Sequence, residues 1–471
     1  MSPPKRHLAA HGLIIRHTTW NLSAAFVVFA FLVFLVALVG AGALAVVHIA
    51  RASANVVYAD TWGHISMVGH FMSGRLFPAE LFAPHNQNRP VVLNIILLLS
   101  ARYDHLNLVH VEYLGVIFAI FTVVMLFYFC RQMFEGNYPL MFIVLSVATL
   151  LMLSLSQWEN FLLPINIVFF STISFSVGSI LLLHKHLLRN RSNGLSVDFF
   201  GAILLSALAL FSMGGGILTP VVNTIQIVLS WILFRKQVRT TIIVYVIIAG
   251  LLIYLKSLGQ SIDYKYDLTH LAEMSQFILA GLGNSTVGFF SNASILQLDI
   301  IFGIFLSAMY AFATIKFFRL PRPEQEQSLG VFSLLLLGIF EQMLIGLGRL
   351  HLGVGNAASS RYATLTMISV VAALILLSTY TRGSRIYAAL AILLGGGICS
   401  FAILADYEEA KMETARMQYA QNLQRLLRGG QITEGEKAQF EWDNLEDIVN
   451  GNEILRQFGL SLYHEKSNPS R

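Results

Sequence analysis

The feature that most constrains this chain is a series of apolar segments, each long enough to cross a lipid bilayer as a helix. Such a helix needs about 20 mostly apolar residues, because the hydrocarbon core is about 30 Å thick. The sequence predicts eleven spans, at residues 22–48, 107–130, 138–155, 161–184, 198–213, 216–234, 240–258, 296–316, 328–347, 363–381 and 386–404. Charged residues make up only 12% of the chain, about half their share in soluble domains. We therefore expect an all-α polytopic membrane protein.

Two further apolar stretches do not fit a full span. The run at 90–100 is too short to cross, and the run at 272–290 is interrupted by Gly281, Gly283 and Asn284. A helix that does not cross the bilayer can lie in its interface. We interpret both stretches as candidates for an interfacial helix, the first of them within a long first periplasmic loop at about 51–106.

The basic residues predict an orientation in the membrane. Lys and Arg in short loops collect on the cytoplasmic side. Alternate connections are basic in this chain, and they carry Lys5, Arg6 and Arg16; Arg131; Lys185, Arg189 and Arg191; Arg235, Lys236 and Arg239; Lys316, Arg319 and Arg322; and Arg382 and Arg385. The N-terminus is therefore expected in the cytoplasm and the C-terminus outside it.

The chain is expected to have two parts, a transmembrane bundle at 1–405 and an extracytoplasmic helical tail at 406–471. Met412, Leu423 and Leu426 have the spacing of an amphipathic helix, which the stretch "RGGQITEG" interrupts. A second helical stretch is expected around 440–458. The tail could cap a site on the outer face or bind a partner, and the sequence leaves both open.

Polar clusters that are too specific for loop filler all fall on the predicted outer side. They are "YADTWGH" (58–64), "HNQNRP" (85–90), "SQWENF" (156–161), "SMGGGILTP" (212–220) and "GRLHLGVGNAASSRY" (348–362). Loops held by a rigid scaffold are common places for binding and catalysis. We expect these clusters to build one site.

The first two clusters supply a candidate base and candidate binding residues. Asp60 can accept a proton from a hydroxyl group, although an aspartate at a helix end is often only solvated. In "HNQNRP" a polar turn before proline needs no function, but a titratable ring and a forked cation exceed what a turn requires. The candidate substrate-binding residues of this cluster are His85, Asn86, Asn88 and Arg89.

The cluster "SQWENF" combines an aromatic ring with polar neighbours in a short connection. Its candidate binding residues are Gln157, Trp158, Glu159 and Asn160. An indole face flanked by polar groups suits a sugar ring, which has apolar C–H faces and a rim of hydroxyls. The alternative is a tryptophan of the interfacial belt. In "SMGGG" a tight hairpin is the favoured interpretation, and close approach of a substrate to bare backbone is the other.

The last cluster places Arg349 and Arg361 on either side of the small residues "GVGNAASS", with Tyr362 directly after. A guanidinium group can fork around phosphate oxygens. Small residues would let a head group approach the chain. The alternative is that the arginines form ion pairs with Glu341 or with an acid of the tail.

A carboxylate, a sugar platform and phosphate-binding arginines on the outer face together resemble the GT-C superfamily of integral-membrane glycosyltransferases. The resemblance rests on the first span, the acid in the first outer loop, a long first loop with a membrane-lying helix, and the multispan bundle. "HNQNRP", "QWENF" and "SSRY" also look like motifs of bacterial GT-C-like proteins. In the superfamily the first-loop acid is catalytic, and this role carries over to Asp60. Many members have two acids close together there, whereas Asp60 is followed by Thr61 and Trp62.

The resemblance implies an enzyme of cell-envelope polysaccharide biosynthesis in a bacterial inner membrane. It would transfer a hexosyl or pentosyl group from a polyprenyl-phosphate donor to a glycan or lipid-linked acceptor, with Asp60 as general base. A divalent ion, Mg²⁺ or Mn²⁺, shared by Asp60 and Glu159 stays an open alternative. So do two other classes, a transporter or flippase of a lipid-linked sugar and a non-catalytic envelope-glycan assembly protein. No nucleic-acid partner is expected.

Overall fold

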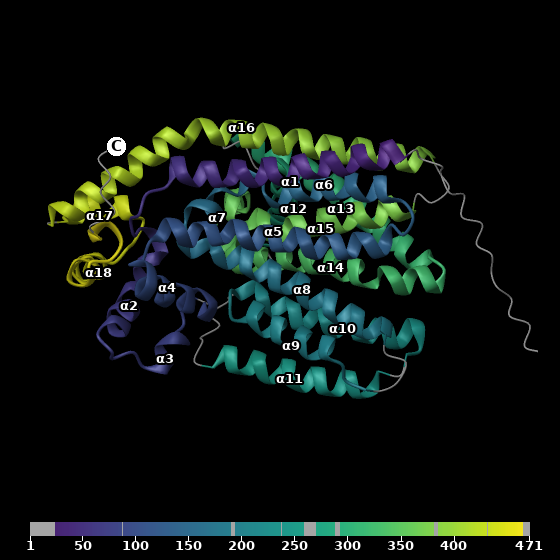
Figure 1. The fold of residues 1–471 in the computed structure, drawn as a ribbon, viewed down its shortest axis with the longest axis horizontal. Coiled ribbons are helices and arrows are strands. Elements are labelled where there is room, and N and C mark those ends of the chain that lie inside the picture. Colours follow the sequence, from purple (N-terminus) through teal and green to yellow (C-terminus); the bar gives the residue numbers. More distant parts are fainter. Residues whose placement is uncertain are drawn as a thin grey trace, which may run out of the picture.

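The computed structural model describes residues 24–86, 88–189, 194–236, 238–258, 270–287, 293–380, 385–430 and 432–464. Within these ranges the chain is α-helical with short 3₁₀ turns, and its only bridge of β type joins His85 to Asn88 (Figure 1). Nine helical segments of the described residues are apolar and long enough to cross a membrane. The predicted class, an all-α polytopic membrane protein, is confirmed at this level.

The eleven predicted spans each coincide with a helix. These helices are α1 (Ala24–Ala52), α5 (Leu108–Met133), α6 (Tyr138–Met152), α8 (Ile167–Arg189), α9 (Val197–Leu210), α10 (Leu218–Phe234), α11 (Arg239–Ser257), α13 (Ala293–Arg319), α14 (Arg322–Arg349), α15 (Ser360–Tyr380) and α16 (Arg385–Gly429). Two of them are not among the nine segments. Helix α9 has 14 residues, which is short for a span, and the predicted span at 386–404 begins where side chains are not described.

The bundle is built around α15 and α8. In the most apolar stretch of α15, 94% of the residues are buried, against 22% in α1 and in α11. Apolar packing gains little over contact with lipid, so hydroxyl groups and close backbone approach help to hold such helices together. Ser176 and Thr219 form one such contact, at 2.6 Å between α8 and α10. The outer helices leave large apolar side chains exposed, as expected for a surface that faces lipid.

The predicted stretch at 272–290 forms a helix as far as residue 287 in spite of its glycines, and residues 288–290 lie outside the described residues. Helix α12 (Leu271–Val287) continues through Gly281 and Gly283 and packs against α13, α14 and α15. A Cβ atom at Gly283 would overlap the backbone of Asp299 on α13. The glycines therefore allow two helices to approach closely and do not interrupt α12.

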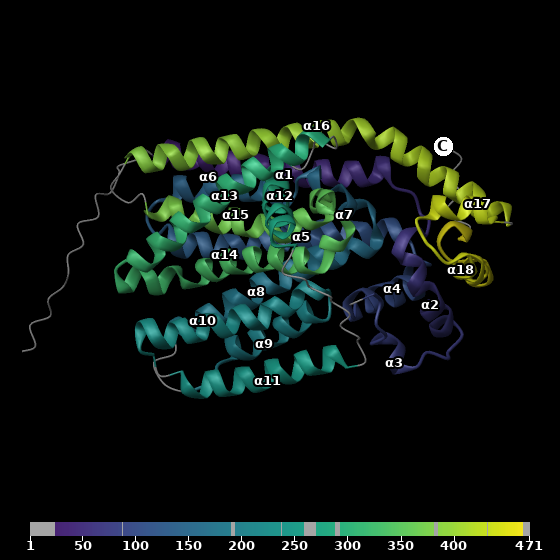
Figure 2. The same ribbon diagram turned by 180° about the vertical axis from the view of Figure 1, so that it is seen from behind.

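The first loop and the tail form a cap at one end of the bundle (Figures 1 and 2). The loop contains η1 (Ala59–His64), α2 (Ile65–Met72), α3 (Pro78–Leu81) and α4 (Val91–Asp104); α4 coincides with the short apolar run. The tail contains α17 (Glu434–Lys437), η8 (Ala438–Phe440), α18 (Leu445–Phe458) and η9 (Ser461–Tyr463). Helix α18 contacts α2 and η1, and the ring centroids of Trp62 and Phe440 lie 6.1 Å apart.

Helix α16 passes through the predicted domain boundary at 405/406 without a break. It ends at Gly429, where the stretch "RGGQITEG" was expected to stop a helix. The imidazole Nδ1 of His48 on α1 lies 3.2 Å from Glu413 Oε1 on α16. The first part of the tail is therefore a direct extension of the bundle.

Candidate functional site

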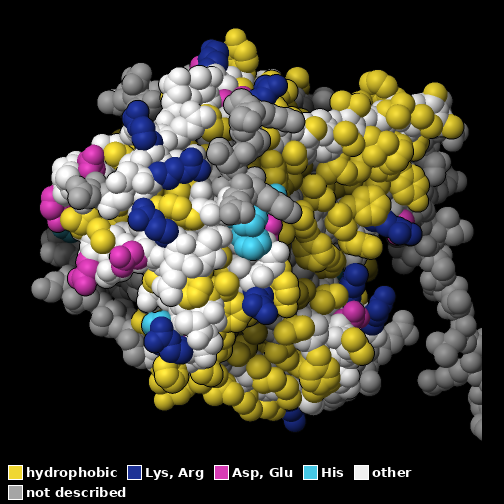
Figure 3. Space-filling model, turned by 60° about the vertical axis from the view of Figure 1, so that its left-hand side comes forward, with side chains coloured by type: hydrophobic (Ala, Val, Ile, Leu, Met, Phe, Trp, Pro, Cys, Tyr) yellow, Lys and Arg dark blue, Asp and Glu magenta, His cyan; other side chains and the backbone are white. Residues whose placement is uncertain are grey.

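The predicted outer clusters meet beneath this cap. Asp60 Oδ2 lies 4.0 Å from His85 Nε2, and this contact joins the cluster at 58–64 to the cluster at 85–90. The amide oxygen of Asn88 lies against Gly214 of η4 (Gly214–Ile217), where a Cβ atom would be 2.5 Å from it. Glu159 Oε2 accepts a hydrogen bond of 3.0 Å from the backbone N–H of Arg361. Figure 3 shows histidine and basic side chains on this end, beside a broad apolar surface.

Asp60 lies in η1, two residues after Tyr58, and its side chain is 46% exposed. The interaction with His85 lowers the pKa of the carboxyl group more than any other cause, and partial burial opposes it. The charges of Arg361 and Arg349 lower the pKa further. Asp60 is therefore an ionised carboxylate that is open to solvent and faces cationic groups.

Packing on both sides fixes the His85 ring. Its centroid lies 4.7 Å from that of His64, and the Trp442 indole of the tail is nearly parallel to it, at 6.2 Å and 9°. His64 is buried and its Nδ1 lies 2.8 Å from Asn94 Oδ1. Burial, the largest cause, and the charge of His85 lower the pKa of His64 to about 4. Trp442 was not predicted from the sequence, because no local pattern places a tail residue beside the first loop.

Arg361 and Arg349 stand at the ends of α15 and α14. Neither forms an ion pair within the described residues, so the alternative of pairing with Glu341 or a tail acid is absent there. Arg361 Nε is buried and has no hydrogen-bond partner among these residues. The guanidinium carbon lies 5.5 Å from the centroid of the Tyr362 ring, whose hydroxyl donates to Asn356 Oδ1 at 3.4 Å.

Glu159 and Asn160, from α7 (Trp158–Leu162), hold the start of α15. Besides the Arg361 N–H, Glu159 Oε2 accepts hydrogen bonds from Ser359 Oγ at 2.9 Å and Ser360 Oγ at 2.8 Å. A carboxylate is favourable at a helix N-terminus, where free N–H groups and the helix dipole meet it. The amide of Asn160 donates to the Arg361 carbonyl at 2.9 Å. These two residues therefore position Arg361.

Three of the predicted binding residues have contacts that stabilise the scaffold. Gln157 is fully buried and donates to the Leu151 carbonyl at 2.9 Å. Arg89 donates to three backbone carbonyls, those of Phe82, Lys256 and Leu258. Asn86 has a φ of +52° in the turn between His85 and Asn88, a conformation that asparagine tolerates well. The guanidinium of Arg89 therefore holds the first loop, at Phe82, to the end of α11.

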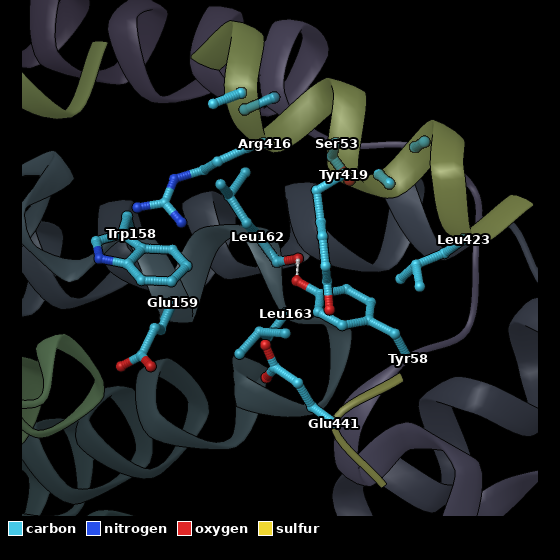
Figure 4. A pocket seen from close by; sticks show the side chains of 14 residues that line it. Ser53, Tyr58, Trp158, Glu159, Leu162, Leu163, Arg416, Tyr419, Leu423 and Glu441 are labelled. Carbon is cyan, nitrogen blue, oxygen red and sulfur yellow. Dashed lines mark hydrogen bonds between the residues drawn. The ribbon is translucent and has the colours of Figure 1, made fainter. Parts of the chain in front are cut away.

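A cavity of about 340 Å³ lies between the end of α1, α7 and α16 (Figure 4). Its lining residues are Ala52, Ser53, Ala54, Tyr58, Trp158, Glu159, Leu162, Leu163, Ala415, Arg416, Tyr419, Ala420, Leu423 and Glu441. The Arg416 guanidinium carbon lies 3.3 Å from the centroid of the Trp158 ring and covers one of its faces. Trp158 and Glu159 are predicted site residues, whereas the wall formed by α16 and Glu441 was not predicted from the sequence.

No group of three His, Cys, Asp or Glu side chains within the described ranges is arranged to hold a metal ion. The charges that lower the pKa of Asp60 are those of His85, Arg361 and Arg349, and such cationic groups suit an anion better than a divalent cation. We derive no step through a metal ion. The chain was compared with protein-family models and with curated proteins, and neither comparison gave a match.

Proposed function

We propose that this protein is a membrane glycosyltransferase that uses a polyprenyl-phosphate sugar and acts on the outer face of a bacterial cytoplasmic membrane. The acceptor would be a glycan or a lipid-linked saccharide. The observation that carries the proposal is the half-exposed Asp60, whose pKa is lowered by His85 and by the charges of Arg361 and Arg349. Within the described residues neither arginine forms an ion pair, and the buried Nε of Arg361 has no hydrogen-bond partner. The Asp60 carboxylate can accept a proton beside a place for a phosphate.

In the proposed reaction Asp60 takes the proton from an acceptor hydroxyl, and the oxygen of that hydroxyl attacks the anomeric carbon of the donor sugar. The bond between that carbon and the phosphate oxygen breaks, so the configuration inverts and polyprenyl phosphate leaves. Arg361, with Arg349, stabilises the charge that grows on the leaving phosphate, because charge-assisted hydrogen bonds gain most where negative charge develops. Glu159 and Asn160 keep Arg361 in place.

The test is transfer of a radiolabelled sugar from polyprenyl phosphate to a membrane glycan acceptor by the protein in nanodiscs. Asp60→Asn should lower the rate on the order of 10²- to 10⁴-fold, the usual contribution of a general base. Asp104→Asn is the matched control, since Asp104 is a half-exposed first-loop acid bonded to His110 at 2.7 Å. Full activity of a well-folded Asp60→Asn protein would contradict the role of Asp60.

A transporter of a lipid-linked sugar is the second candidate, because ionisable side chains are buried in the bundle, Lys256 and Glu341 among them. Lys256 Nζ donates to the carbonyls of Leu210 at 2.9 Å and Met213 at 2.7 Å. Glu341 lies against Gly215, and its oxygens have no hydrogen-bond partner in the described part of the chain. Charged groups inside membrane helices often mark transport paths. Movement of labelled lipid between leaflets without sugar transfer would favour this candidate.

A further inference from the structure

The cavity between α7 and α16 offers the combination of surfaces that a saccharide needs. Leu162, Leu163 and Leu423 give it apolar walls, and the rings of Tyr58 and Tyr419 meet at 6.3 Å and 76°. Glu441 adds a carboxylate as hydrogen-bond acceptor, and Glu159 adds a second carboxylate, whose Oε2 is already bonded to the start of α15. Sugars present C–H faces to apolar walls and hydroxyl groups to acceptors. A volume of about 340 Å³ lies within the range of small-ligand sites.

The charges around the cavity disfavour an anionic ligand. Arg416 is the one cation in the lining, and it donates to both oxygens of Glu409, at 2.5 and 2.9 Å. Its charge is therefore already balanced by a residue outside the lining. Glu159 and Glu441 then leave the cavity with an excess of negative charge, which repels phosphate and uronate groups.

Glu159 joins the cavity to the place proposed for the donor phosphate. It lines the cavity, and its Oε2 also accepts the hydrogen bond from the Arg361 N–H. Tyr58, on the facing wall, precedes Asp60 by two residues, and its hydroxyl donates to the Leu162 carbonyl at 3.2 Å (Figure 4). Two lining residues therefore connect the cavity to the candidate reaction site, Tyr58 through the chain segment that carries Asp60, and Glu159 through its bond to Arg361.

We propose that this cavity binds the acceptor as a non-anionic saccharide of one or two rings, and that α16 and Glu441 form its recognition wall. The term acceptor rests on the proposed glycosyltransferase function, but binding of the saccharide does not require turnover. The tail then belongs to the substrate site.

The experiment is saturation-transfer NMR on the full-length protein in nanodiscs with methyl glycosides of neutral and amino sugars, galacturonic acid and glucose 1-phosphate. A neutral or amino glycoside should bind, and the anionic sugars should bind weakly. Ala415→Leu, which fills the cavity, should reduce the affinity about tenfold, equivalent to about 1.4 kcal/mol. The matched control is Thr414→Leu, since both positions are exposed on the same turn of α16 and Thr414 is not in the lining.

Glu441→Lys gives a second test, because Glu441 is exposed and its replacement should not affect folding. The variant should gain affinity for galacturonic acid. Binding of alkyl glycosides more tightly than methyl glycosides would indicate a lipid-linked acceptor, and equal binding a free glycan. The proposal fails if no glycoside binds, if Ala415→Leu has no effect, or if glucose 1-phosphate binds best. Glycoside binding without sugar transfer would refute only the glycosyltransferase function.

Discussion

Asp60 takes its electrostatic environment from residues that lie far from it in the sequence. His85 follows it in the first loop, whereas Arg361 and Arg349 come from the ends of α15 and α14. All three lower the pKa of the carboxyl group. The group therefore favours the folded state above the pKa of the unfolded chain, and this contribution is lost as the pH falls through the lowered pKa.

The pH dependence of sugar transfer should reveal the contribution of His85. In His85→Gln the pKa of Asp60 should rise toward its ordinary value, because the largest cause of its lowering is removed. The acid limb of the pH–rate profile should then move to higher pH. His110→Gln is the control, since His110, at the start of α5, pairs with Asp104 of the first loop. An unchanged acid limb would show that His85 does not act on the reacting group.

Arg361 should determine the affinity for the phosphate of the donor. Loss of a charge-assisted hydrogen bond costs about 1.5–3 kcal/mol, so Arg361→Gln should weaken binding of farnesyl phosphate on the order of 10- to 100-fold. Thermophoresis of the protein in nanodiscs would measure it. Arg102→Gln removes an exposed first-loop arginine and should have little effect. Equal affinities for all three proteins would place the phosphate elsewhere.

At the scale of elements, the segment "SMGGG" has the tight connection that its sequence favoured, and what approaches its glycines is the protein's own side chains. It forms a tight connection between α9 and α10, and side chains also approach its bare backbone. Asn88 lies against Gly214, and Glu341 lies against Gly215. A Cβ atom at Gly216 would overlap the carbonyl of Ala209. The three glycines thus let the first loop, α9 and α14 meet, which holds the site to the bundle.

Gly216→Ala should therefore destabilise the protein by about 1–3 kcal/mol, the usual cost of overpacking. A fixed backbone carbonyl cannot move aside as a flexible side chain can. The measurement is thermal unfolding in detergent. Gly250→Ala on α11 is the control, because no atom lies within 4 Å of its added Cβ and alanine favours helix by about 1 kcal/mol. A melting temperature for Gly216→Ala as high as that of Gly250→Ala would contradict the close approach.

At the scale of the whole molecule, the tail and the first loop form one cap. Gly451 of α18 lies against the indole of Trp62, where a Cβ atom would be 3.0 Å from the ring. The backbone N–H of Ser461 donates to the His105 carbonyl at 2.7 Å, and the rings of His105 and His464 are stacked at 3.7 Å. The tail therefore closes over the end of the bundle that carries the candidate site.

The predicted orientation places this cap outside the cytoplasm. With Cys130 and Cys399 replaced by serine, Asn444→Cys should react with an impermeant maleimide in right-side-out vesicles. Glu324→Cys, at the opposite end of the bundle, should react only after permeabilisation. Both positions are exposed, so burial does not limit the reaction. The reverse labelling pattern would place the site in the cytoplasm and exclude a donor on the outer leaflet.

The sequence by itself determined where the long apolar helices of this protein lie, but not that α12 continues through its glycines. A span needs about 20 apolar residues whose backbone hydrogen bonds are made within the segment, so each is visible locally. The short helix α4 and the end of α16 at Gly429 could also be predicted locally, the first from a short apolar run and the second from the glycines of "RGGQITEG". The sequence also identified the outer clusters, because specific polar groups are conspicuous in a chain with so few.

Only the tertiary structure decided what each polar side chain contacts. Glu159 accepts a hydrogen bond from Ser359, 200 positions away in the sequence. Trp158 is covered by Arg416 of α16, a helix whose second half the sequence assigned to the tail. Arg89 was expected to bind substrate but holds the end of α11. The role of a side chain depends on its partners in space, and the close approach of distant backbone segments decides these partners.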